Sequence, residues 1–189
     1  MAKKKSKKMD VLALVLTIVV IALAVLTICT LFMPVFTSKS SAFGGAIANE
    51  THIKGSDVIT ACFKGETSSD LSYGANALIS LKGSDDAGFV TGLFCWMYFL
   101  AVIVSVAVVV FALLKVFGFK FKLVNVIFGI ALVVLALVAF ICSFVVAGKF
   151  TSVAIGGVVE GKTIASAGNY LMLLAVAFGG ADAYLARQK

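Results

Sequence analysis

The feature that most constrains this chain is an uncharged apolar run, Val11–Phe36, that follows a cluster of lysines. A helix rises about 1.5 Å per residue, so about 20 residues cross the roughly 30 Å hydrocarbon core of a bilayer. The run has 26 residues and can span with some tilt. A basic segment before a first apolar helix holds that end in the cytoplasm. We therefore expect a cytoplasmic N-terminus (residues 1–10) and a transmembrane helix (residues 11–36).

The composition favours the same class of protein. The chain is 61% hydrophobic and 13% charged, whereas a soluble domain has about a quarter of its residues charged. The net charge of +7 lies mainly beside the apolar runs, so topology explains it better than nucleic-acid binding does. A cleaved signal peptide, ending near Ala46-Ile47-Ala48, is the alternative for the N-terminus. It is disfavoured because signal cores are only about 7–15 residues long.

Three more apolar runs predict helices at residues 89–114, 123–147 and 165–186. They leave a long outer loop (37–88), a basic turn (115–122), a short outer loop (148–164) and a C-terminus (187–189). The short inner segments then hold ten lysines and arginines and the longer outer loops six, the bias that the positive-inside rule predicts. The expected fold is an all-α integral protein of the cell membrane, a four-transmembrane-helix bundle with both termini cytoplasmic.

The long outer loop carries two short apolar patches, Asp57–Phe63 and Ala75–Leu81, between regularly spaced glycines. Short runs with β-branched residues between glycine turns are typical of strands. We therefore expect a small extracellular β-sheet on the bundle, with an irregular loop as the alternative.

The segments that leave the first and third predicted helices are similar in order. Phe36-Thr37-Ser38 precedes Ala42-Phe43-Gly44-Gly45-Ala46, and Phe150-Thr151-Ser152 precedes Ala154-Ile155-Gly156-Gly157-Val158. The similarity suggests duplicated hairpins, or a chance match between apolar helices. If the hairpins are duplicated, both segments should be equivalent strands that pair or lie side by side above the bundle.

The layout resembles that of claudin-type and other tetraspan proteins in topology only. The claudin signature is a Gly-Leu-Trp followed by two cysteines in the first outer loop. Here Gly92-Leu93-Phe94 falls in the second predicted helix, and the long loop has one cysteine, Cys62. No residue role is therefore carried over from that family.

Cys62 and Cys95 are the candidate disulfide pair, because one lies in the outer loop and the other near the outer end of the second helix. A bridge needs Cα atoms within about 7 Å, and a free Cys62 is the alternative. Cys29 and Cys142 lie in apolar helices, where cysteine behaves as a small hydrophobe. No CxxC motif is present.

Catalytic and metal chemistry have little support in the sequence. His52, the single histidine, has Glu50 and Asp57 nearby, but one histidine with two scattered acids is a weak metal signal. We expect no enzyme activity, no cofactor and no metal. Asn49 begins a glycosylation sequon on the predicted outer side. Asp182 is the candidate ionisable group inside the helices, and it lies close to the cytoplasmic end.

Small residues and aromatic residues suggest packing and anchoring. Small residues four apart let helices approach closely, within the bundle or between copies of a homo-oligomer, and tryptophan and tyrosine gather at membrane interfaces. The small-residue rows are Gly88 with Gly92, Ala175 with Gly179 and Ala183, and Ala177 with Ala181; the expected outer aromatic belt is Phe94, Trp96, Tyr98, Phe99 and Tyr170.

These features predict a structural or interaction protein of the membrane. Its partners would be the lipid bilayer, a protein bound at the outer loops, and a second copy of the chain. An oligomeric channel or transport subunit is the alternative, since such an assembly could become polar only at the contacts between copies.

Overall fold

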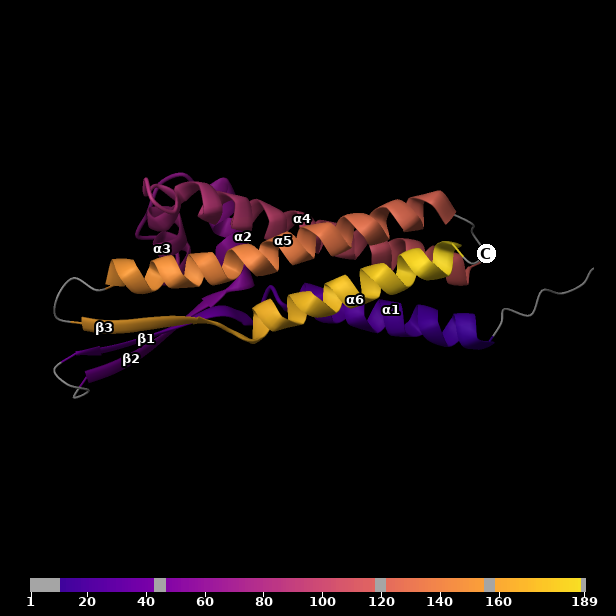
Figure 1. The fold of residues 1–189 in the computed structure, drawn as a ribbon, viewed down its shortest axis with the longest axis horizontal. Helices are drawn as coiled ribbons and strands as arrows, with labels where there is room; N and C mark the ends of the chain where they lie inside the picture. The colour runs from indigo at the N-terminus through magenta and orange to yellow at the C-terminus, as the bar shows by residue number, and fades with distance from the viewer. Residues whose placement is uncertain (1–10, 43–46, 118–121, 155–158, 188–189) are drawn as a thin grey trace, which may run out of the picture.

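The protein is mostly helical, with a small sheet at one end (Figure 1). The computed structural model describes residues 11–42, 47–117, 122–154 and 159–187. The basic N-terminus, part of the basic turn and the last two residues lie outside these ranges. The helices are α1 (Val11–Cys29), α2 (Gly55–Phe63), α3 (Tyr73–Lys82), α4 (Gly88–Val116), α5 (Lys122–Ala154) and α6 (Ala167–Arg187); the strands are β1 (Pro34–Ala42), β2 (Ile47–Lys54) and β3 (Val159–Ala165).

The four long helices α1, α4, α5 and α6 form a bundle along the long axis of the molecule (Figure 1). In this bundle α1 contacts α4 and α6, and α5 contacts α4 and α6. The start of α1 and the end of α6 lie at one end of the bundle, and the sheet lies at the other with α2 and α3 (Figure 1). We call β1, β2, β3, α2 and α3 the headpiece. The headpiece thus lies at one end of the bundle, opposite the start of α1 and the end of α6 (Figure 1).

Among the described residues, two helices are long and apolar enough to cross a membrane. They are Gly88–Leu114 of α4, with a mean hydropathy of 2.9, and Leu123–Phe150 of α5, with a mean hydropathy of 3.1. The apolar stretches of α1 and α6 are shorter, Thr17–Cys29 and Ala167–Ala181. The second and third predicted helices therefore meet this criterion, and the first and fourth fall short of it.

The helix ends differ from those expected. The first helix stops at Cys29 rather than residue 36, because the chain turns at residues 30–33 and Pro34 opens a strand. Proline lacks the N–H that a continuing helix would need. The third helix extends past residue 147 to Ala154. This extension places the last turns of α5 beside β3.

The sheet is antiparallel, with the order β2-β1-β3. In this register Phe36 lies opposite Ile53 on β2 and Ala165 on β3, and Thr37 lies opposite His52. Side chains alternate between the two faces of a sheet. Phe36 and Ile53 are buried, and His52 is exposed. One face therefore packs on the protein, and the other is open.

Phe36 fixes the sheet to the bundle. Its ring centroid lies 5.4 Å from that of Phe94 on α4 and 5.9 Å from that of Phe150 on α5. All of the Phe36 side chain is buried. Tilted aromatic contacts at these distances add to the free energy of burial, so β1 is held by two helices at once.

A sheet is present, as expected, but its strands are not the predicted ones. The patches Asp57–Phe63 and Ala75–Leu81 form α2 and α3 instead. The buried positions of α2 include Val58, Ala61 and Cys62, which is helical spacing. The β-branched residues of these patches are therefore a poor guide, because tertiary packing overrides strand propensity.

The expected equivalence of the two exit segments is also wrong. Phe36 and its neighbours form β1, whereas Phe150–Ala154 continue α5. Residues 43–46 and 155–158 lie outside the described residues. β1 does pair with a strand of the second of the two predicted outer loops, but that strand is β3, which begins only at Val159. The structure thus gives the two hairpins different local folds.

Candidate functional site

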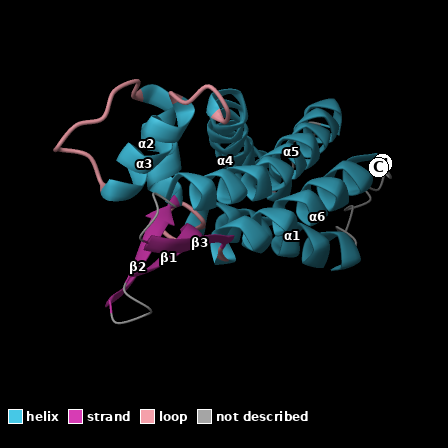
Figure 2. Cartoon of the chain, turned by 60° about the vertical axis from the view of Figure 1, so that its left-hand side comes forward, coloured by secondary structure: helices cyan, strands magenta, loops and turns pink. Residues whose placement is uncertain are grey.

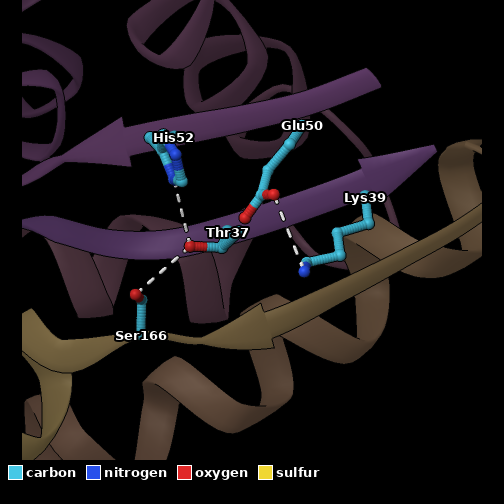
Figure 3. A network of polar contacts seen from close by, with 5 residues as sticks. All are labelled: Thr37, Lys39, Glu50, His52 and Ser166. Atoms are coloured by element: carbon cyan, nitrogen blue, oxygen red, sulfur yellow. Dashed lines mark hydrogen bonds and ion pairs between the residues drawn. The ribbon is translucent and has the colours of Figure 1, made fainter. Parts of the chain in front are cut away.

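The open face of the sheet carries a set of polar side chains, shown in Figure 3. We call it the polar face. The amine of Lys39 lies 3.6 Å from Glu50 Oε2. Both side chains are about half exposed or more, at 62% and 48%. Surface ion pairs contribute about 0–1 kcal/mol to stability, so this pair is better suited to recognition than to holding the fold.

A hydrogen-bonded row continues this face towards α6. Thr37 Oγ1 lies 3.2 Å from His52 Nδ1, and it donates to Ser166 Oγ at 3.2 Å (Figure 3). Because the Thr37 proton goes to Ser166, the Thr37 oxygen accepts from His52. The row joins β1 and β2 to Ser166, the residue between β3 and α6.

Asp57, expected near His52, has a structural role. Its carboxylate accepts from Lys54 N at 2.8 Å and from Ser72 Oγ at 2.6 Å. Ser72 in turn caps α3 by accepting from Ala75 N at 3.1 Å. One carboxylate thus closes the start of α2 and holds the start of α3. Within the described ranges, no three histidine, cysteine, aspartate or glutamate side chains gather to hold a metal.

The headpiece is joined to the bundle where α2 begins. Ser56 N donates to Leu31 O at 2.8 Å, and Gly55 N donates to Met33 O at 3.2 Å. The first N–H groups of α2 thus pair with carbonyls of the turn after α1. Gly55 is needed at this point, because a Cβ there would clash with Tyr98 Oη and lie 2.5 Å from Thr30 O. Figure 2 shows α2 and α3 beside α4, and their contacts are with its N-terminal part.

The structure brings the two predicted cysteines together. Cys62 on α2 and Cys95 on α4 are buried free thiols. The Cys95 thiol donates a hydrogen bond to Cys62, and this bond lowers the pKa of Cys62; burial opposes the shift, and the positive charge of Lys82 assists it. Lys82 Nζ also donates to Ala61 O at 2.9 Å and to Cys62 O at 3.2 Å. The lysine therefore caps the end of α2 beside the thiols.

Sequence reasoning did not anticipate the roles of Lys82 and Phe63. The Phe63 ring lies 5.6 Å from that of Trp96 and 4.9 Å from that of Phe99, both edge-on. These contacts press the end of α2 onto α4 next to the thiols. If residues 55–63 had been predicted as a helix, Cys62 and Phe63 would have been expected at its C-terminal end. The prediction of a strand did not place them there.

The expected aromatic belt needs correction at two positions. Phe94 and Tyr98 are fully buried and belong to the core. Trp96 and Tyr170 are exposed, and Phe99 is half-buried. Two residues along a helix is a rotation of about 200°, so neighbouring aromatic residues of α4 face opposite ways.

The small-residue row of α6 packs inside the bundle. A Cβ on Gly179 would lie 2.8 Å from Gly129 O on α5, and Ala175 is fully buried. The side chain of Ala183 lies outside the described part of the chain, as do those of Asn49 and Asp182. Glycine at position 179 lets the α5 and α6 backbones approach closely.

The glycine pair of α4 does not form such a row. A Cβ on Gly88 would lie 2.5 Å from Lys82 O, the carbonyl at the end of α3. A Cβ on Gly92 would have no atom within 4 Å. Gly88 therefore allows the backbone to approach closely in the turn from α3 into α4, whereas Gly92 faces open space.

Comparison with protein-family models, with curated proteins and with solved structures gives no match. The class of protein is therefore defined by the fold alone: a mostly helical chain with two candidate membrane-spanning helices and a small sheet.

Proposed function

We propose that all four long helices cross the cell membrane and that the headpiece presents a partner-binding surface outside the cell. The observation that carries this proposal is an outward apolar stripe on each long helix. Soluble proteins rarely expose apolar patches beyond a few hundred Å². The exposed residues are Val15, Ile18, Val19, Val25 and Leu26 on α1; Leu100, Ile103, Val106, Val110 and Leu113 on α4; Ile127, Ile130, Val134, Leu137 and Ile141 on α5; and Tyr170, Leu173 and Tyr184 on α6.

Helix length supports adding α1 and α6 to the two candidate spans. α1 has 19 residues and α6 has 21. At about 1.5 Å per residue both approach the roughly 30 Å of a hydrocarbon core. Ile18 on α1 is 56% exposed, and Leu173 on α6 is 40% exposed. Exposing these apolar side chains to water costs free energy, and contact with lipid removes that cost.

The arrangement of the ends supports an even number of crossings. The start of α1 and the end of α6 share one end of the bundle (Figure 1). The lysines of residues 3–8 precede α1, and Arg187 ends α6. Basic residues at one shared end favour a cytoplasmic position for it. The headpiece is then on the outer side.

An interaction role is favoured over transport because the described bundle interior has little polar chemistry. Ser105 Oγ donates to Ala101 O of its own helix, and Ser143 Oγ donates to Phe140 O. Buried side-chain oxygens without a hydrogen-bond partner in the described part are those of Thr91 and Asn125, one near the start of α4 and the other near the start of α5. They do not make a continuous polar path.

The polar face is the surface that we propose for the partner. It offers a cation, an anion, an imidazole and hydroxyls on a rigid three-stranded frame, and its residues Lys39, Glu50 and His52 are exposed. Charged and hydrogen-bonding groups on a fixed frame give specificity more than affinity. A protein partner with complementary charges fits this surface.

Topology is tested with single-cysteine variants in a chain whose four native cysteines are replaced by alanine. Ser69→Cys and Lys162→Cys should react with an impermeant maleimide in sealed cells. Ser6→Cys and Gln188→Cys should react only after permeabilisation. Equal labelling of Ser6→Cys and Ser69→Cys would exclude α1 as a span, and equal labelling of Lys162→Cys and Gln188→Cys would exclude α6.

The partner surface is tested with a photo-crosslinking amino acid at Lys39, Glu50 or His52. Each position should give a discrete crosslinked protein in intact cells. Tyr73 and Asp85 are matched controls, because they are exposed residues of α3 and of the turn that follows it, outside the polar face. If the topology holds and the polar face gives no more adducts than the two controls, the binding proposal is wrong.

A further inference from the structure

Two buried thiols meet where the headpiece rests on the bundle, and they come from elements far apart in the sequence. Cys62 is 5% exposed and Cys95 is completely buried. Cys62 and Cys95 belong to one buried cluster where α2 packs on α4, and a hydrogen bond pairs the two thiols. The contact is fixed from two sides: Phe63 packs on Trp96 and Phe99, and Lys82 holds the end of α2 through its carbonyls.

We propose that Cys62 and Cys95 are a site of covalent modification, an intramolecular disulfide that clamps the end of α2 to α4. Disulfides persist in oxidising compartments, and small extracellular units use them to supplement a limited hydrophobic core. The headpiece fits this description, since α2 and α3 are short helices of nine and ten residues.

The bond forms by thiol–disulfide exchange with a disulfide of low molecular weight, such as oxidised glutathione. The Cys62 thiolate attacks one sulfur of that disulfide, and one thiolate leaves and takes up a proton. The Cys95 thiolate then attacks the Cys62 sulfur of the mixed bond, and the second small thiol leaves. Two protein thiols are oxidised and one small disulfide is reduced to two thiols, so atoms and electrons balance.

Cys62 is the thiol that reacts first. It is the next-to-last residue of α2, and the residues that follow it, 63–70, are exposed. Cys62 is the more accessible of the two thiols, because it is slightly exposed in the last turn of α2, whereas Cys95 is completely buried within the 29-residue helix α4. The lowered pKa of Cys62 gives it the larger thiolate fraction at the pH of its surroundings.

The test uses the reduced, purified full-length chain with Cys29→Ala and Cys142→Ala, exposed to oxidised glutathione and mapped by mass spectrometry. We expect a peptide crosslink between Cys62 and Cys95 and no lasting glutathione adduct. With Cys95→Ser, glutathione should remain on Cys62, because the resolving thiol is missing. With Cys62→Ser, Cys95 should stay unmodified.

A folded chain that retains both thiols, a lasting adduct on Cys62 beside an intact Cys95, or crosslinks only between copies would each overturn the proposal. Circular dichroism and size exclusion show that each variant is folded before it is scored. The chemistry does not depend on the proposed function, but the oxidising environment does. A crosslink in the purified chain that is missing from peptides of acid-quenched intact cells would uphold the thiol pairing and contradict the outer position of the headpiece.

Discussion

The hydroxyl of Tyr98 lies 2.9 Å from Thr30 Oγ1, and this buried contact joins α4 to the turn after α1. Thr30 also donates to Thr27 O at 2.6 Å, so the tyrosine hydroxyl donates to the threonine oxygen. Residues 68 positions apart are thereby held at the level where α2 begins. The contact couples the bundle to the headpiece.

Tyr98→Phe should remove this bond without opening a cavity. A buried hydrogen bond contributes about 0.5–1.5 kcal/mol net, and Thr30 keeps its bond to the backbone. We expect a small but measurable fall in the thermal unfolding midpoint in detergent. Tyr73→Phe is the matched control, because Tyr73 is 71% exposed. Equal midpoints for the two variants would show that the Tyr98 hydroxyl does not stabilise the junction.

Gly55→Ala should be far more damaging than its size suggests. The new methyl group would clash with the Tyr98 hydroxyl and lie 2.8 Å from the Cα of Leu31. Overpacking costs about 1–3 kcal/mol and sometimes more. Gly65→Ala is the control, since a Cβ there meets nothing within 4 Å. The thermal unfolding midpoint and the protease resistance of the headpiece should fall in Gly55→Ala alone. Unchanged resistance in this variant would refute the close approach of Gly55 to Tyr98 and Leu31.

Gly179→Ala and Gly180→Ala form a second matched pair. The first places a methyl group 2.8 Å from Gly129 O and pushes α6 from α5, while the second places it in open space. Alanine is the better helix former by about 1 kcal/mol, so Gly180→Ala should be neutral or stabilising. Unfolding midpoints in lipid nanodiscs measure both. A larger fall in the unfolding midpoint for Gly180→Ala than for Gly179→Ala would contradict the structure, in which Gly179 faces α5 and Gly180 faces open space.

Asp57→Asn should loosen the headpiece and leave the bundle intact. The variant loses the charged acceptor of Lys54 N and Ser72 Oγ, and losing a helix cap costs about 0.5–2 kcal/mol. Hydrogen exchange should rise in α2 and α3 and stay unchanged in α5. Asp70→Asn serves as the control, because Asp70 is an exposed loop residue. An equal rise in hydrogen exchange in α2, α3 and α5 would instead mean that Asp57 stabilises the whole fold.

The reactivity of Cys62 should depend on pH in a direction set by its lowered pKa. In the reduced chain with Cys29→Ala and Cys142→Ala, alkylation by iodoacetamide should inflect below the ordinary cysteine range. Cys95→Ala should move the inflection up, because it removes the hydrogen-bond donor. Lys82→Gln should move it up less, since its charge is the smaller cause. An inflection that stays in place in Cys95→Ala would contradict the thiol contact.

The same lowered pKa has a consequence for stability. A group with a depressed pKa in the folded state contributes stability that is present above the unfolded pKa and is lost as pH falls through the folded pKa. The contribution of Cys62 to stability is therefore greatest at and above the ordinary cysteine pKa of 9.0. It declines towards neutral pH.

The sequence by itself determined α4 and α5, because a long uncharged apolar run has one stable form in lipid and a distinctive length. It also indicated a small sheet, although not the strands that form it. It could not settle α2 and α3, because runs such as DVITACF are short enough to pack as strand or helix. Buried neighbours decide between these, and neighbours are a tertiary property.

Only the tertiary structure decided which side chains meet. Phe94 and Tyr98 turn inward and Trp96 outward, although all three are aromatic and lie within one and a half turns. The polar face exists because β3 and β2 flank β1, although β3 lies far from β1 in the sequence, between α5 and α6. Local sequence sets the length and apolarity of a segment, but the direction in which each residue faces depends on contacts between distant segments.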